Sequence, residues 1–70
     1  MKHHAYHKQE LAALYFPGDS KRNAGYKFRT LLQTTPGLLD RLYNEAFYTK
    51  KQRIITPRQL KIIVEALGEP

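Results

Sequence analysis

The sequence predicts a compact all-α domain of four helices, with an extended arm or a short strand before the last helix. Apolar residues recur three and four positions apart in several segments, which is the spacing of one helix face. Capping residues, prolines and glycines stand where several of these segments begin or end. At 70 residues the chain is long enough for one domain with a small core. We expect residues 1–7 to be a flexible, histidine-containing tail and residues 8–70 to form a single helical domain.

The first helix is expected over residues 8–16. Leu11, Leu14 and Tyr15 follow helical spacing and form one apolar stripe. The Pro-Gly pair that follows ends the helix, because proline disfavours helix in the residue before it and glycine tolerates turn conformations.

The second helix is expected to begin at Asp19 or Ser20, since both residue types are good N-caps. One side is apolar and carries Ala24, Phe28 and Leu31, with Leu32 beside them. The opposite side is basic, polar and aromatic; it carries Arg22, Tyr26, Arg29 and Gln33, with Asn23 and Lys27 at its flank. Gly25 weakens the helix by about 1 kcal/mol relative to alanine. It either marks a close approach to the first helix or is tolerated there.

The third helix is expected to start after Thr35, with Pro36 at its first position. Its broad apolar face makes it the expected scaffold helix, and that face comprises Leu38, Leu39, Leu42, Tyr43, Ala46 and Phe47. Residues 48–55 have no helical stripe, so they form either an extended arm or a short strand.

The fourth helix has the most complete end signals. Thr56 is the expected N-cap, Pro57 takes the first helical position, and Gln59 completes a capping box. Gly68 is expected to end the helix in the left-handed conformation. The buried stripe is expected to consist of Leu60, Ile63, Val64 and Leu67.

The charge is unevenly distributed. Twelve Lys and Arg residues face six Asp and Glu residues, which gives a formal net charge of +6. Residues 20–39 and residues 50–64 contain basic residues and no acidic ones. Such a balance favours a polyanionic partner, and the two stretches can form one continuous footprint in the fold. Plain solubility is the alternative explanation of the charge.

Residues 10–33 have the pattern of a helix-turn-helix unit, whose second helix enters the major groove of DNA. Arginines can bind phosphates or guanine, amide side chains can read adenine, and a tyrosine can stack on a sugar. The candidate nucleic-acid-binding residues are Lys21, Arg22, Asn23, Tyr26, Lys27, Arg29, Gln33, Lys50, Lys51 and Arg53. The last three would grip the flanking backbone as a wing does, or form an ordinary charged loop.

Other chemistry finds little support in the sequence. A glycine-rich phosphate loop and a serine elbow are absent, and the histidines all lie in residues 1–7, so we expect no catalysis and no cofactor. His3 and His7 have a possible zinc spacing, but no nearby carboxylate or thiolate completes a site, so no metal is expected. The apolar runs are too short to span a bilayer, and a cytoplasmic protein is expected.

Two blocks of the sequence resemble a known family. The first block is ELAALYFP (residues 10–17), followed by a polar turn and Asn-Ala, and the second is ITPRQLKIIVEALGEP (residues 55–70). Together they resemble small uncharacterised bacterial proteins of the domain of unknown function 4248 type. That resemblance implies no known activity. The first block is followed by a turn and a serine-capped basic helix. This order of elements resembles the start of excisionase-like and resolvase-like helix-turn-helix proteins. This looser resemblance implies that residues 20–33 form a recognition helix.

The sequence therefore favours a small, non-catalytic DNA-binding regulator or accessory factor of the helix-turn-helix type. Useful affinity would require a homodimer, adjacent copies on DNA or a larger protein partner. The alternative is a protein–protein interaction module with incidental basic charge, docking through exposed Tyr26, Tyr43 or Phe47. The sequence does not distinguish DNA from RNA as the partner.

Overall fold

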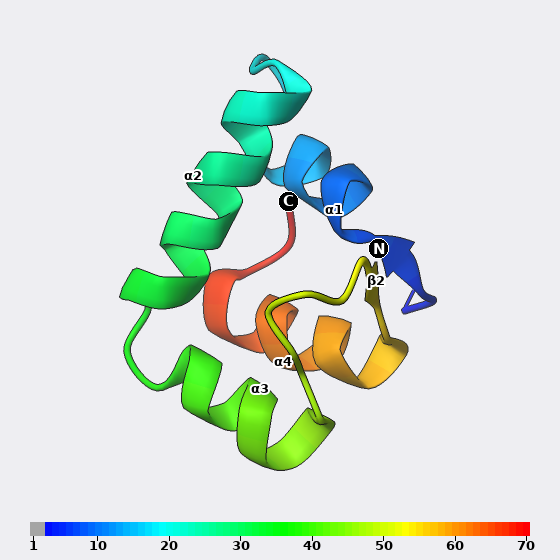
Figure 1. The fold of residues 1–70 in the computed structure, drawn as a ribbon, viewed down its shortest axis with the longest axis vertical. Helices are drawn as coiled ribbons and strands as arrows, with labels where there is room; N and C mark the ends of the chain where they lie inside the picture. The colour runs from blue at the N-terminus through cyan, green and yellow to red at the C-terminus, as the bar shows by residue number, and fades with distance from the viewer. Residues whose placement is uncertain (1–2) are drawn as a thin grey trace.

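A computed structural model describes residues 3–70, which form four helices and a small two-stranded sheet (Figure 1). The helices are α1 (Lys8–Tyr15), α2 (Lys21–Thr34), α3 (Leu38–Ala46) and α4 (Pro57–Leu67). The strands are β1 (Tyr6–His7) and β2 (Ile54–Ile55). The expected fold class, a compact mostly helical domain with a short strand before the last helix, is confirmed.

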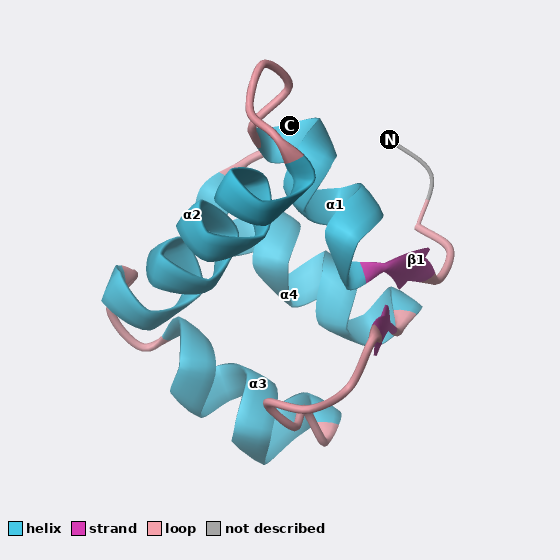
Figure 2. Ribbon diagram, turned by 45° about the horizontal axis from the view of Figure 1, so that its top comes forward, coloured by secondary structure: helices cyan, strands magenta, loops and turns pink. Residues whose placement is uncertain are grey.

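Helix α4 lies at the centre of the arrangement, with α3 on one side and α1 on the other (Figure 1, Figure 2). Helix α1 packs against α2, and α3 packs against α4. Every helix contributes to one core, whose largest fully buried apolar side chains are Leu11, Phe28, Leu32, Leu38, Leu42, Ile55, Leu60 and Ile63. Within residues 3–70, every helix is too short or too polar to traverse a bilayer.

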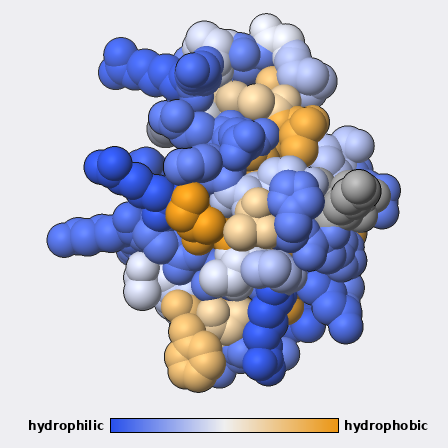
Figure 3. All heavy atoms as spheres, turned by 90° about the vertical axis from the view of Figure 1, so that its right-hand side faces the viewer, coloured by the Kyte–Doolittle hydropathy of each residue, from blue (hydrophilic) through white to orange (hydrophobic). Residues whose placement is uncertain are grey.

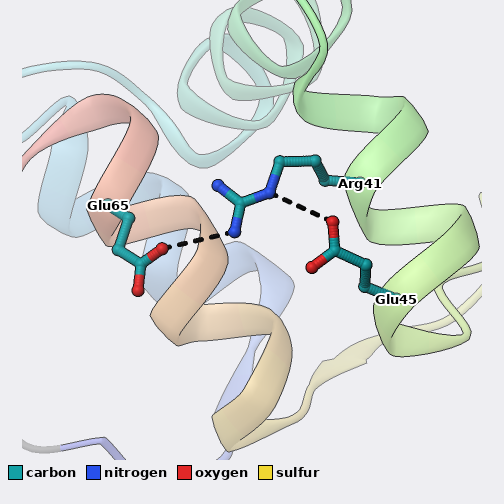
Figure 4. Close-up of polar contacts among 3 residues, drawn as sticks. All are labelled: Arg41, Glu45 and Glu65. Atoms are coloured by element: carbon teal, nitrogen blue, oxygen red, sulfur yellow. Dashed lines mark hydrogen bonds and ion pairs between the residues drawn. The ribbon is translucent and has the colours of Figure 1, made fainter.

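An arginine on α3 also ties that helix to α4 at the surface. The Arg41 guanidinium binds Glu45 on its own helix and Glu65 on α4, each at 3.3 Å (Figure 4). Because all three side chains are substantially exposed, this network adds little to stability.

The two strands pair antiparallel, with Tyr6 opposite Ile55 and His7 opposite Ile54. This corrects the expected flexible tail, because residues 6–7 belong to the sheet and Tyr6 packs against the core. The pairing continues into α1, where the Lys8 amide donates to the carbonyl oxygen of Arg53 at 2.7 Å. The segment over residues 48–55 is therefore a loop that ends in a short strand. Residues 1–2 of the expected tail lie outside the described residues.

Helix α1 is fixed at both ends. The Glu10 carboxylate accepts a hydrogen bond from the His7 amide at 3.1 Å at its beginning. At its end, the Tyr15 hydroxyl donates to the Gly68 carbonyl at 2.6 Å, which ties α1 to the residues that follow α4. The expected first helix is confirmed to within one residue, and Leu14 is 45% exposed rather than part of the core.

Helix α2 begins after Ser20, whose Oγ accepts a hydrogen bond from the Asn23 amide at 3.2 Å. Ser20 is therefore the N-cap, and Asp19 instead pairs with a lysine further along the helix. The apolar side faces the core with Ala24, Phe28 and Leu32 buried. Leu31, which was expected on this side, is only partly buried.

Gly25 is tolerated in α2 rather than required, because a Cβ built there has no heavy atom within 4 Å. Gly25→Ala is expected to raise the free energy of unfolding by about 0.5–1 kcal/mol, since alanine costs less backbone entropy in a helix. Urea unfolding followed by circular dichroism measures this. Gly37→Ala is the control: its Cβ also has open space, but φ is +75°, so that variant should be destabilised. A Gly25→Ala midpoint at or below the wild-type value would contradict the prediction.

Helix α3 starts later than expected. Pro36 was expected at the first helical position, but Gly37 adopts a left-handed backbone conformation and α3 begins at Leu38. A turn closed by the Leu38 amide and the Thr35 carbonyl at 3.2 Å precedes it. The buried face is also narrower than expected, because Phe47 is 85% exposed and Tyr43 is 38% exposed.

Phe47 ends α3 in the left-handed conformation, with φ 55° and ψ 35°, a place where glycine is usual. Phe47→Gly is expected to raise the free energy of unfolding by about 1 kcal/mol, because it removes the clash between Cβ and the backbone. Phe47→Ala removes the exposed ring but keeps Cβ, so thermal unfolding should show little change for that control. The prediction fails if the two substitutions have the same effect.

Helix α4 confirms its expected end signals. Thr56 Oγ accepts from the Gln59 amide at 3.2 Å, and Gln59 Oε1 accepts from the Thr56 amide at 3.1 Å. Leu60 and Ile63 are fully buried, whereas Val64 and Leu67 are partly buried. Gly68 has the expected positive φ of 83°, but its ψ of 173° is extended rather than helical.

Candidate nucleic-acid interface

The polar side of α2 is open to solvent. All the candidate residues on this helix are exposed, namely Lys21, Arg22, Asn23, Tyr26, Lys27, Arg29 and Gln33. Four of these residues form one stripe along α2, because each lies three or four positions after the one before it. They are Arg22, Tyr26, Arg29 and Gln33. This stripe is available to a partner.

One side of α2 borders a hollow of about 420 Å³ that lies between α2, the start of α1 and the loop before β2. We call it the basic groove, defined by the cationic residues Lys8, Lys21, Arg22, Arg29 and Lys50. Among the described residues, no carboxylate lines it. The second helix and the loop, which belong to the two acid-free stretches of the sequence, thus contribute to a single surface.

A neighbouring hollow of about 320 Å³ opens between α2, α3 and the same loop. We call it the tyrosine pocket, and its lining is Lys8, Arg29, Leu32, Gln33, Leu39, Tyr43, Tyr48 and Lys50. Lys8, Arg29 and Lys50 line both hollows, so the two adjoin. On the face drawn in Figure 3, hydrophilic side chains predominate and hydrophobic ones form separate patches.

Lys8 is a member of the groove that sequence reasoning missed. Its Nζ lies 4.9 Å from the centre of the Tyr48 ring and donates to the Lys50 carbonyl at 3.4 Å. Burial, together with the positive charge of Arg29, lowers the pKa of Lys8 below its usual value. No local pattern around Lys8 signals this role, because its neighbours in the groove lie far along the chain.

Two glutamines hold the loop that carries Lys50. Gln52 accepts from the Thr49 amide at 2.9 Å and donates to the Ile54 carbonyl at 2.7 Å. The buried Gln59 side chain contacts Gln52 and donates to the Ala46 carbonyl at 2.9 Å. These bonds close the loop at both ends, so Lys50 is held beside α2.

Some candidate residues do not join the groove. Lys27 points to the other side of α2, where its Nζ pairs with the Asp19 carboxylate at 2.9 Å and lies over the Phe16 ring. Asn23, Lys51 and Arg53 are exposed outside the lining of both hollows. Of the three basic candidates before β2, the groove therefore contains Lys50 alone.

Other site types are not assembled in the part of the chain that the structure describes. Within residues 3–70, no three histidine, cysteine, aspartate or glutamate side chains gather in an arrangement that would hold a metal ion. The basic groove and the tyrosine pocket remain the surfaces whose chemistry points to a ligand.

The fold and the groove define a small, mostly helical domain with a basic concave surface. The chain belongs to the family described as a domain of unknown function, DUF4248, whose model matches residues 2–70. The expected membership of this family is thereby confirmed. No curated protein and no solved structure matches the chain significantly. The family description names no activity, so a functional proposal depends on the groove.

Proposed function

We propose that this protein is a small, non-catalytic DNA-binding domain that acts as a regulator or accessory factor. The observation that carries the proposal is the basic groove, where Lys8, Lys21, Arg22, Arg29 and Lys50 converge with no carboxylate among the described lining residues. Lysine and arginine side chains that contact phosphates release the counterions condensed on DNA, and this release favours binding.

The electrostatics of the groove supports an anionic partner. Burial lowers the pKa of Lys8, and the nearby charge of Arg29 lowers it further. No carboxylate among the described lining residues balances these positive charges. A phosphate between these side chains would offset their repulsion and accept their hydrogen bonds. The DNA backbone supplies a row of such phosphates.

Helix α2 is the proposed reading element. Its exposed stripe presents an arginine, a tyrosine and an amide, Arg22, Tyr26 and Gln33. Arginine recognises guanine, an amide side chain recognises adenine, and a tyrosine packs on sugars or a thymine methyl group. Because one copy offers one such helix, a homodimer or adjacent copies on DNA are proposed for tight binding.

The test is a titration of labelled mixed-sequence duplex DNA followed by fluorescence anisotropy at two salt concentrations. Saturable binding is expected at low salt. If all the groove cations contact phosphates, affinity should fall by roughly 500-fold between about 50 mM and about 200 mM salt. Absence of binding at low salt would overturn the proposal.

A protein-interaction module is the second candidate, and Phe47 is the observation that favours it. Its ring is 85% exposed, and the residue holds a left-handed conformation that is unfavourable for phenylalanine. Large exposed aromatic side chains are typical anchors of protein interfaces. If the titration shows no DNA binding, a partner that Phe47→Ala no longer recognises would support this second candidate.

A further inference from the structure

We infer that the tyrosine pocket binds one unpaired nucleotide, with the base against its apolar floor and the phosphate against its cationic rim. The inference deepens the proposed function and rests on it, because the pocket adjoins the basic groove through Lys8, Arg29 and Lys50. A strand whose backbone lies in the groove passes beside the mouth of the pocket.

The floor of the pocket suits a flat aromatic ligand. It is built from the buried Leu32 and the partly buried Leu39, beside the buried Tyr48, whose ring already faces the Lys8 Nζ at 4.9 Å. Tyr43 forms a wall that is 38% exposed, and its ring centre lies 5.7 Å from that of Tyr48, with an angle of 56° between the ring planes. Tyrosine rings at single-strand sites stack on nucleobases, and every base has a π-face.

The rim of the pocket suits an anion. Lys8, Arg29 and Lys50 contribute cationic side chains to the lining, and no described carboxylate is part of it. Gln33 adds an amide, which can both donate to and accept from the polar edge of a base. An apolar floor beside three cations matches a nucleotide, which joins an aromatic base to a phosphate.

The size of the pocket is sufficient for a single nucleotide, and base stacking requires that nucleotide to be unpaired. A hollow of about 320 Å³ is at the small end of ligand sites, which begin at about 300 Å³. Bases inside an intact duplex are stacked and cannot enter a side pocket unless they are extruded. A bulged or single-stranded nucleotide, or a free nucleotide, can enter it.

The experiment compares two labelled duplexes that differ only by one bulged nucleotide, using fluorescence anisotropy at low salt. The wild-type protein is expected to bind the bulged duplex about tenfold more tightly, as stacking of one base allows. Tyr43→Ala should remove this preference and leave affinity for the paired duplex nearly unchanged. Phe47→Ala is the matched control: it removes an exposed aromatic ring just beyond α3 that does not line the pocket. The preference should survive in that variant.

A second arm uses a free nucleoside monophosphate and follows backbone amide signals by NMR, with circular dichroism to verify that each variant is folded. Shifts centred on Leu39 and Tyr43 that Tyr43→Ala abolishes would support the pocket with a free nucleotide as its source, even if no DNA binds. Equal affinity for the two duplexes, together with no such shifts, overturns the inference. In that case binding of the paired duplex would leave the proposed function standing, and its absence would overturn both.

Discussion

Replacing Arg22 and Arg29 together by alanine is expected to lower affinity for mixed-sequence duplex DNA by at least roughly 30-fold at low salt. Both arginines line the basic groove, and loss of each contact to a phosphate or base costs about 1–3 kcal/mol. The slope of log affinity against log salt should also become shallower by about 2. Fluorescence anisotropy across a salt series measures both quantities.

A control with the same loss of net charge separates the groove from general electrostatics. Arg58→Ala with Lys61→Ala also removes two positive charges, from exposed positions on α4 outside the lining of the groove. That pair should weaken binding only a few-fold. Equal losses in the two double variants would mean that the groove is not the binding site. The fold should survive both, because substitutions of exposed side chains usually change stability by less than about 0.5 kcal/mol.

Replacing Gln59 by alanine is expected to lower the free energy of unfolding by about 3 kcal/mol, the largest effect on stability that we expect from a polar residue. Gln59 is only 2% exposed, and its side chain bonds the Ala46 carbonyl, the Thr56 amide and Gln52. Removing it leaves buried backbone groups without partners and opens a cavity. Urea unfolding of wild type and variant measures the difference.

The same substitution should also weaken DNA binding under conditions where the variant is folded. Gln52 and Gln59 hold the loop that carries Lys50. Without the Gln59 side chain this loop is expected to lose order, which moves the Lys50 ammonium away from the groove. Gln9→Ala is the control for stability, because Gln9 is exposed on α1 and should change unfolding little. A Gln59→Ala variant as stable as wild type would show that the glutamine pair does not hold the loop.

Helix boundaries with local signals were predictable from the sequence. The capping box of Thr56 and Gln59 lies within four consecutive residues, and Ser20 caps α2 through a residue three positions away. Pro36 predicts a start for α3 that is two residues early, because the left-handed Gly37 delays the helix to Leu38. A Pro-Gly pair is itself a turn signal, and the turn over Pro36 and Gly37 agrees with that signal.

Features that depend on distant contacts were not predictable. Strand β2 was one of the two alternatives for residues 48–55. Strand β1 and the pairing of the two strands were not predictable, because each strand has two residues and the two lie far apart in the sequence. Because that pairing brings Lys8 beside Lys50, the position of Lys8 in the groove could not be predicted from the sequence either. Phe47 was expected on the apolar face of the third helix but is exposed, because the left-handed backbone at the end of α3 turns this side chain away from the core.

The candidate site was predictable in part. Exposure of the α2 stripe follows directly from the rotation of about 100° per residue, which separates Arg22 and Arg29 from Phe28. Periodicity could not show that Lys27 pairs with Asp19, nor that Lys50 alone of its basic neighbours reaches the groove. The pairing of Lys27 depends on the conformation of the turn before α2, and the position of Lys50 depends on the conformation of the loop before β2.

The most direct test of the basic groove as a nucleic-acid interface is NMR mapping of backbone amides during titration with short duplex DNA at low salt. The largest shifts are expected on Lys8, on Lys21 to Arg29 along the exposed side of α2, and on Lys50. Shifts should be small around Arg58 and Lys61 on α4. Shifts concentrated on α4, or no shifts at saturating DNA, would contradict the basic groove as the nucleic-acid interface.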